Sequence, residues 1–179
     1  MPERLHQLNL HFDPVEDRIL LRMTVGAPEA LSEFRIWLTR RFAALLWKSL
    51  QGAAAESVRA DERIAPASRD AVLRFQQESA LAQADFSTPF SLGDVATPLG
   101  DAPILVSRAR IARTPRGGHV LSLQAADGPA LQINMNDQLL HSFMKLLSEA
   151  AGKAQWGLDL RLTSEREGTP DQPVPARLS

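Results

Sequence analysis

Polar and apolar residues alternate along the first part of the chain. The alternation runs through residues 8–12 and again through residues 19–25, with the turn-like sequence DPVED at residues 13–17 between them. A period of two is typical of β-strands that bury one face. We therefore expect an antiparallel hairpin, followed by a third strand over residues 34–38 whose inward side chains are apolar.

A helical period replaces the alternation in three later segments. The first helix begins at the cap Thr39 and fades in the alanines after Gly52, and the second begins near Pro66 with a less regular apolar face. The third begins at the cap Asn136 and is expected to end at Gly152. Threonine and asparagine are favoured at these caps because their side-chain oxygens accept hydrogen bonds from first-turn N–H groups.

Strand-like alternation returns after the second helix. Residues 85–103 hold three prolines and two glycines, which predicts an irregular connector with at most a short strand near residues 86–90. Beyond the connector we expect strands over residues 104–113, 119–125 and 131–135. The last of these runs directly into the third helix.

The C-terminal region contains two segments of different character. Alternating apolar residues over 156–162 predict a closing C-terminal strand. The tail, residues 164–179, is rich in proline and charge and has little to bury, so we expect it to be flexible. Residues 1–163 are therefore predicted to form a single α+β domain of antiparallel strands with three helices.

Two stretches of the chain match each other at a shift of 97 residues. FRIWLTRRFAALLWKSL, from Phe34, aligns with LQINMNDQLLHSFMKLL, from Leu131, and this alignment pairs Leu46 with Phe143. One interpretation is an internal duplication of a βββα unit, with half-repeats at residues 5–60 and 104–152 that bury their apolar faces against each other. The alternative is that strand-to-helix junctions share caps and periodicity for physical reasons alone.

Composition removes several classes of function. The chain has 179 residues, is 44% hydrophobic, and carries 20 basic against 21 acidic residues, so its net charge of -1 gives no overall attraction for nucleic acid or an anionic membrane. The absence of cysteine excludes disulfides, thiolate metal sites and cysteine nucleophiles. No stretch reaches the roughly 18 apolar residues of a membrane span, and we expect a cytoplasmic protein.

Recognisable catalytic motifs are missing from the sequence. The four histidines, His6, His11, His119 and His141, have no second ligand at a metal-binding spacing, so we expect no metal. There is no nucleophile elbow and no phosphate-binding glycine loop, and we expect no cofactor. An enzyme is therefore only the third interpretation of the chain.

A basic hairpin is the first candidate for binding chemistry. No acidic residue occurs between Asp101 and Asp127, and the predicted strands there contain no aromatic residue for base stacking. Such a hairpin suits a phosphate backbone, or it is a solvated edge kept basic to prevent aggregation. Its arginines are Arg108, Arg110, Arg113 and Arg116.

The start of the first helix is the second candidate. Arg40 and Arg41 follow the cap Thr39, although the positive end of a helix dipole favours acidic residues, as Asp137 illustrates in the third helix. Thr39, Arg40 and Arg41 are thus predicted to bind an external anion or a partner. The alternative is that the arginines pair with nearby carboxylates. The candidates for that pairing are Glu16, Asp17 and Glu33.

These observations favour a non-enzymatic cytoplasmic binding or assembly protein that acts through a protein-partner surface, and self-association as a homodimer is expected. The alternative is a protein that binds single-stranded nucleic acid or a small anion through the arginine-rich hairpin and the helix N-terminus.

Overall fold

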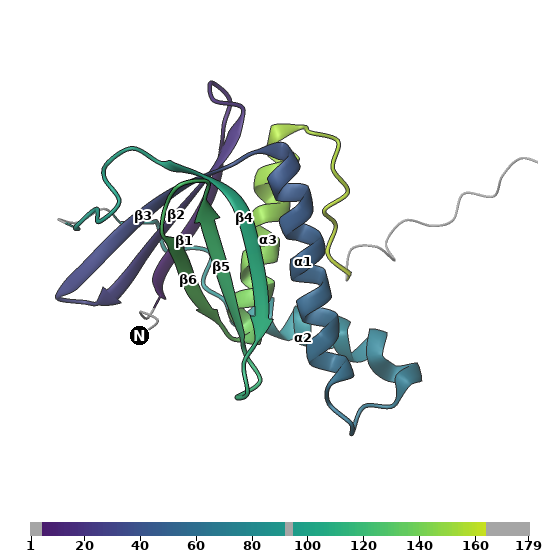
Figure 1. Cartoon of the computed structure of the whole chain (residues 1–179). Coiled ribbons are helices and arrows are strands. Elements are labelled where there is room, and N and C mark those ends of the chain that lie inside the picture. The colour runs from purple at the N-terminus through teal and green to yellow at the C-terminus, as the bar shows by residue number, and fades with distance from the viewer. Residues whose placement is uncertain (1–4, 92–94, 164–179) are drawn as a thin grey trace, which may run out of the picture.

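The computed structural model describes residues 5–91 and 95–163, which form an α+β fold (Figure 1). The strands are β1 (Leu5–Asp13), β2 (Arg18–Ala27), β3 (Ala30–Leu38), β4 (Ile104–Arg113), β5 (His119–Ala125) and β6 (Ala130–Met135). The helices are α1 (Arg40–Arg59), α2 (Arg69–Gln83), preceded by a 3-10 turn (Pro66–Ser68), and α3 (Asp137–Ala154). The three predicted helices and the two three-stranded sets are confirmed.

The six strands form one sheet in the order of the sequence. Neighbouring strands are antiparallel except at the centre, where β3 and β4 pair in parallel through Ile36 with Ile104 and Trp37 with Leu105. Parallel neighbours need a long crossover connection, and α1, α2 and the connector supply it. The sheet therefore consists of two antiparallel meanders joined edge to edge.

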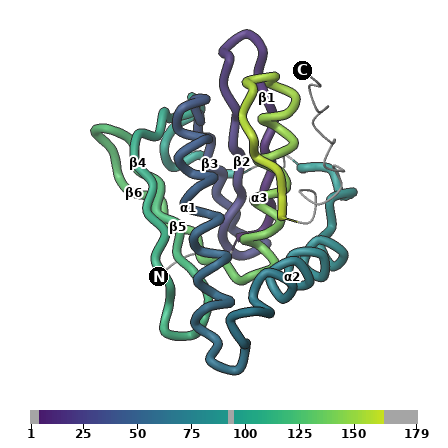
Figure 2. The backbone as a smooth tube through the Cα atoms, turned by 90° about the vertical axis from the view of Figure 1, so that its right-hand side faces the viewer, coloured from purple at the N-terminus to yellow at the C-terminus, as the bar shows by residue number. Residues whose placement is uncertain are grey.

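The core lies between the sheet and the helices. Figure 2 shows α1 and α3 running side by side on the same side of the sheet, with α2 across their lower end. The inward positions of the first meander are in register, as in the row Leu10, Leu21 and Ile36, and all three are buried. They belong to one hydrophobic cluster with Leu46 of α1 and Phe143 of α3. Both halves of the chain therefore share a single core.

The two βββα units agree in local detail. The Thr39 hydroxyl accepts a hydrogen bond from Phe42 N–H at 3.2 Å, and the Asn136 side-chain oxygen accepts one from Leu139 N–H at 2.8 Å. Within the sheet, the last strand of the first unit meets the first strand of the second, so the units are arranged head to tail. These features fit a duplication, which stays a prediction.

The expected closing strand over residues 156–162 is wrong, because this segment has no strand pairing. Trp156 and Leu160 are nevertheless buried. The Trp156 Nε1–H donates to Asp17 Oδ1 at 2.8 Å, and its ring meets Phe12 edge-on at 5.8 Å. The alternation correctly indicated which side chains are buried, but burial here comes from packing on the core rather than from a sheet edge.

Two smaller expectations also differ from the structure, and a third is not tested by it. Helix α1 continues past Gly52 to Arg59, because Ala53, Ala54 and Val58 are buried against the core. Residues 86–90 are not a strand; instead Ala96 forms an isolated parallel bridge with Ser32. The predicted flexible tail, residues 164–179, lies outside the described residues.

Candidate functional site

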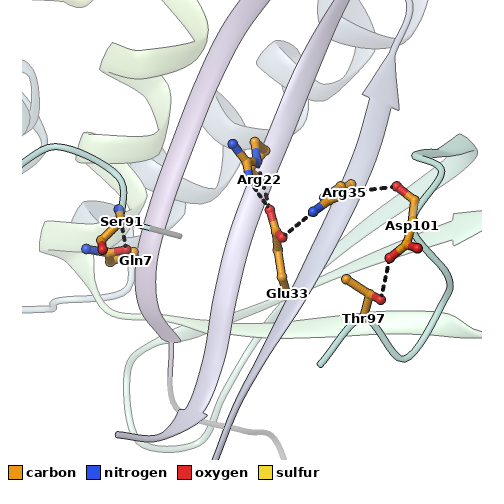
Figure 3. A network of polar contacts seen from close by, with 7 residues as sticks. All are labelled: Gln7, Arg22, Glu33, Arg35, Ser91, Thr97 and Asp101. Carbon is orange, nitrogen blue, oxygen red and sulfur yellow. Dashed lines mark hydrogen bonds and ion pairs between the residues drawn. The ribbon is translucent and has the colours of Figure 1, made fainter. Parts of the chain in front are cut away.

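A buried ion-pair network fixes the connector to the outer face of the first meander (Figure 3). Glu33 is only 1% exposed, and its two carboxylate oxygens accept hydrogen bonds from Arg22 Nε and Arg35 Nη2, each at 2.8 Å. Arg35 also donates from Nη1 to the Asp101 carbonyl at 2.8 Å, and Arg22 lies over the Phe90 ring, 4.7 Å from its centre. The connector is thus held at both of its ends.

The charge balance at Glu33 favours the ionised carboxylate. Burial alone would raise the pKa of Glu33, but the hydrogen bonds from Arg35 and Arg22 and their positive charges outweigh burial and hold it below its ordinary value of 4.5. The same interaction raises the pKa of Arg35. This network is a structural clamp, because both Glu33 oxygens accept hydrogen bonds from the arginines and Arg35 also donates to the connector; Arg35 Nε has no partner among the described residues.

The clamped connector forms one wall of a large groove with a volume of about 1320 Å³. The other walls are residues 5–9 of β1, residues 114–116 and 118–119 at the β4–β5 turn, residues 134–136 at the end of β6, and α3 residues between Gln138 and Leu146. Ser91 N–H donates to Gln7 Oε1 at 3.2 Å, which ties the connector to β1 beside the groove. The groove therefore lies between the edge strand β1 and α3.

The floor along β1 is one of the two free edges of the sheet. Leu5, His6, Gln7, Leu8 and Asn9 all line the groove. Side chains of a strand alternate between its two faces, so five consecutive residues can line one groove only where the groove follows the edge of the strand. Strand β1 pairs only with β2, and across the described residues no backbone hydrogen bond is made on its other side.

The side chains of the groove are mostly uncharged. Phe86 and Phe90 of the connector and Leu139 and Leu146 of α3 supply its apolar surface. Its polar surface is largely amide and hydroxyl, from Gln7, Asn9, Thr88, Thr114, Asn134, Asn136, Gln138 and Ser142. Amides offer both hydrogen-bond donors and acceptors. This lining suits a neutral chain with polar backbone and apolar side chains, rather than a polyanion.

Connector residues beside the groove are locally ordered. Asp85 accepts hydrogen bonds from the backbone N–H groups of Ser87 and Thr88 at 2.9 and 3.1 Å. The hydroxyls of Thr88 and Ser87 and these N–H groups stabilise the carboxylate and lower the pKa of Asp85. Lys145 Nζ lies over the Phe86 ring, 5.4 Å from the ring centre. The aromatic wall is therefore attached to both β1 and α3.

His119 and His141 were considered from the sequence only as metal ligands, and their burial was not predicted. His119 and His141 are 1% and 2% exposed, and neither ring nitrogen of His119 has a hydrogen-bond partner among the residues that the structure describes. His119 lines the groove. His119 is two residues before Leu121 on β5, so its side chain lies on the same buried face as Leu121 and Leu123. This alternation was the sequence signal that could have identified His119 as buried.

The basic hairpin does not form one patch. Arg108 and Arg110 are exposed on the outer face of the second meander, in register with Gln124 and Ser122. Arg113 has the opposite parity and is in register with His119, while Arg116 lies in the turn and lines the groove. The prediction that Arg108 and Arg110 share a face is confirmed. The four arginines, however, are divided among three places.

The start of α1 is exposed at both arginines. Thr39 caps the helix as predicted, but Arg40 and Arg41 make no ion pair with any described residue. The carboxylates proposed as their partners are engaged elsewhere: Glu33 with Arg22 and Arg35, Glu16 with Arg18 at 3.7 Å, and Asp17 with Trp156. The pairing with Glu16, Asp17 or Glu33 is therefore wrong, and the anion site stays a prediction.

The double variant Arg40→Asp, Arg41→Gln is expected to raise the free energy of unfolding by about 1 kcal/mol, because it removes two positive charges from a helix N-terminus and adds a negative one. Chemical denaturation measures this change. The matched control is Arg59→Gln in the last turn of α1, where a basic residue is favourable, and it should destabilise slightly. A double variant less stable than wild type would mean that the arginines already hold an anion.

Acidification from pH 7.5 to 5.5 is expected to lower the free energy of unfolding. Burial lowers the pKa of both His119 and His141. The negative charge of Asp137 raises the pKa of both histidines and so partly offsets burial. At His119, Glu56 also raises the pKa, and the positive charge of Arg113 lowers it further. The unfolded chain keeps the ordinary value of 6.5, so it takes up protons first as the pH falls through that value. Denaturation curves across this range measure the slope.

The histidine variant His141→Leu should flatten the pH dependence. Its imidazole is replaced by a group that does not titrate, while Asp137 and the carboxylates elsewhere are retained. A slope unchanged in this variant and in His119→Leu would show that other groups titrate in this range.

Other classes of site are restricted by the structure. Within residues 5–91 and 95–163 no group of three or more histidine or acidic side chains is placed to hold a metal ion. In the same residues no helix is both long enough and apolar enough to cross a bilayer. No protein-family model, curated protein or solved structure matches the chain. The groove is consequently the feature on which a function can be argued.

Proposed function

We propose that the chain is a non-enzymatic binding protein that takes an extended segment of a partner protein into the groove as an added strand along β1. The observation that carries this proposal is the set of five consecutive β1 residues, Leu5 to Asn9, that line the groove. Their free backbone groups can pair with an extended peptide in the manner of β-strand addition.

The composition of β1 supports a binding edge. Natural proteins protect open edge strands with lysine, proline or bulges that prevent pairing with another chain. Strand β1, LHQLNLHFD, contains no lysine, arginine or proline, and its one irregularity lies between Leu5 and Gln7. An edge without lysine, arginine or proline, beside an amide-rich, partly apolar groove, fits a strand-forming partner with alternating apolar side chains.

The clamped connector favours binding further. Affinity is reduced by the entropy lost when loops become ordered on binding. The wall that contains Phe86 and Phe90 is already held by the Glu33 network and by Gln7. The groove is thus preformed for its partner.

Affinity selection with random hexapeptides tests this function. Immobilised protein should retain a subset of the pool, and the retained peptides should lose about tenfold or more in affinity when alternate backbone N–H groups are methylated. His6→Lys places a long charged side chain in the groove at an exposed position of β1 and should abolish retention. Its matched control, Gln132→Lys on the opposite edge strand β6, should not.

Two results would contradict the proposal. One is that no peptide is retained. The other is a stable dimer in light scattering that His6→Lys dissociates and Gln132→Lys does not, because β1 would then be occupied by a second copy of the chain.

A second candidate function rests on a different surface. Arg108 and Arg110 are exposed on one face of the second meander, which supports binding of single-stranded nucleic acid or a small anion. A gel shift at low salt that Arg108→Glu with Arg110→Glu abolishes would support this function. If the wild-type protein gives no gel shift at low salt, nucleic-acid binding is contradicted.

A further inference from the structure

One corner of the groove combines three features that favour an anion. Residues of the first turn of α3, His119 and Arg116 line the same groove. In Figure 1 the β4–β5 turn and the start of α3 both lie at the lower end of the sheet. We call this part of the groove the α3 corner and define it by Arg116, His119, Asn136 and Gln138.

The helix start provides free donors. Asn136 uses its side chain for Leu139 N–H at 2.8 Å and its carbonyl for Leu140 N–H at 2.9 Å. The N–H groups of Asp137 and Gln138 have no partner in the described part of the chain. Free N–H groups at the positive end of a helix dipole favour an anion.

His119 gives an independent indication of a ligand. Buried polar atoms in folded proteins are nearly always hydrogen-bonded, because an unpaired one costs about 1 to 3 kcal/mol. Both ring nitrogens of His119 lack a partner within the described residues, although the residue is 1% exposed and lines the groove. Both nitrogens are inaccessible in the structure, so a bound acceptor at the α3 corner would satisfy one of them after the ring turns toward the groove.

Arg116 is held in place by the turn that carries it. Thr114 N–H donates to the Gly118 carbonyl at 2.7 Å, and Gly118 N–H donates to the Thr114 hydroxyl at 3.1 Å. A Cβ at Gly118 would lie 2.9 Å from the Met135 carbonyl, so the turn packs closely on the end of β6. Among the described residues Arg116 is the only lysine or arginine that lines the groove.

The nearby carboxylate of Asp137 does not cancel this charge. Asp137 is not part of the groove wall; it lines the neighbouring cavity with Arg113, and Ser57 Oγ donates to its Oδ1 at 3.5 Å. The charged groups that act on His119 are Asp137 of α3, Glu56 of α1 and Arg113 of β4. The anion that we infer would approach from the groove side, where Arg116 lies.

We propose that the α3 corner binds the C-terminal carboxylate of the partner segment, so that the groove recognises the end of a chain. This inference rests on the proposed peptide-binding function. A single carboxylate matches one guanidinium, one imidazole and the two N–H groups, whereas the amide-rich groove beside them, in which Asp85 is the lining carboxylate, accepts the preceding residues. A polyanion would find no further cation along β1.

The test compares one random hexapeptide pool with free C-terminal carboxylates and the same pool with C-terminal amides. Immobilised full-length protein should retain the free acids at least about tenfold better, as expected for losing a charge-assisted contact. Equal retention of both pools would overturn the carboxylate site while leaving the peptide groove intact. Retention of neither pool would overturn the groove and the site together.

Variants locate the effect. Arg116→Gln changes an exposed turn residue and should remove most of the preference for free acids while the amidated pool binds as before. The matched control is Arg110→Gln on the same hairpin, which faces the opposite side of the sheet and should keep the preference. A preference that survives Arg116→Gln and His119→Gln, both verified as folded by circular dichroism, would also overturn the site.

Discussion

Glu33→Ala is expected to lower the free energy of unfolding by about 3 kcal/mol, because removing one partner of a buried charge network leaves the others uncompensated. Arg22 and Arg35 would face each other in register across β2 and β3 without the carboxylate between them. Their partial exposure keeps the effect at the lower end of values for fully buried pairs. Urea denaturation of the two proteins measures it.

Two comparisons make this prediction specific. Glu78→Ala, on the exposed side of α2, is the matched control and should change stability by less than about 0.5 kcal/mol. In wild type, the contribution of Glu33 should be lost as the pH falls below its ordinary value of 4.5, because its pKa is lowered only in the folded state. A Glu33→Ala protein as stable as the control would show that the network contributes nothing.

The loss of Glu33 should also release the connector. Glu33 N–H donates to the Ala96 carbonyl at 2.7 Å, and Ala96 N–H donates to the Leu31 carbonyl at 3.2 Å, so the connector is bonded beside the network. Hydrogen exchange at Ala96 N–H should accelerate in Glu33→Ala and stay unchanged in Glu78→Ala. Peptide retention should fall as well, because the wall with Phe90 would no longer be fixed.

Phe143→Ala is expected to cost about 3 to 5 kcal/mol, the range for removing a large side chain from a packed core. Phe143 is 1% exposed and belongs to the cluster shared by α1, α3 and both meanders. The cavity left by the missing ring would be lined by elements from both halves of the chain. Movement of one half alone could therefore not fill it. Thermal or chemical unfolding measures the loss.

The matched control for this change is Phe75→Ala on α2. Phe75 is 68% exposed, so the same change of side chain should cost less than about 0.5 kcal/mol. Leu46→Ala tests the other half of the chain, because Leu46 is as buried as Phe143. This substitution should lower the free energy of unfolding by about 2 to 5 kcal/mol. A Phe143→Ala cost no larger than that of Phe75→Ala would contradict the shared core.

Local chemistry made the strands and helices predictable from the sequence. Caps such as Thr39 and Asn136 and alternation such as that of β2 depend on neighbouring residues only, and the structure reproduces them. The segment 156–162 shows the limit of this reasoning, because alternation identifies buried side chains but does not identify a pairing partner.

Most of the candidate site could not be predicted, since it depends on tertiary arrangement. Nothing in the sequence places Arg116 beside the start of α3, or indicates that β1 rather than a central strand is the free edge. Glu33 and its arginines were equally hidden, because they lie on the outer face of a strand pair where polar residues are ordinarily solvated. Glu33 is buried, its two arginines are partly exposed, and the connector contacts both arginines through Phe90 and the Asp101 carbonyl.

The head-to-tail joining of the two meanders has a consequence for assembly. Within the chain, the last strand of one unit pairs with the first strand of the next. The same pairing could form between molecules, with β6 of one chain against β1 of another. Head-to-tail contacts of this kind propagate into open fibres. Here β1 lines a groove that is also walled by the connector and α3, and we expect these walls to hinder the approach of a whole sheet edge. The walls that define the groove are therefore also expected to oppose polymerisation.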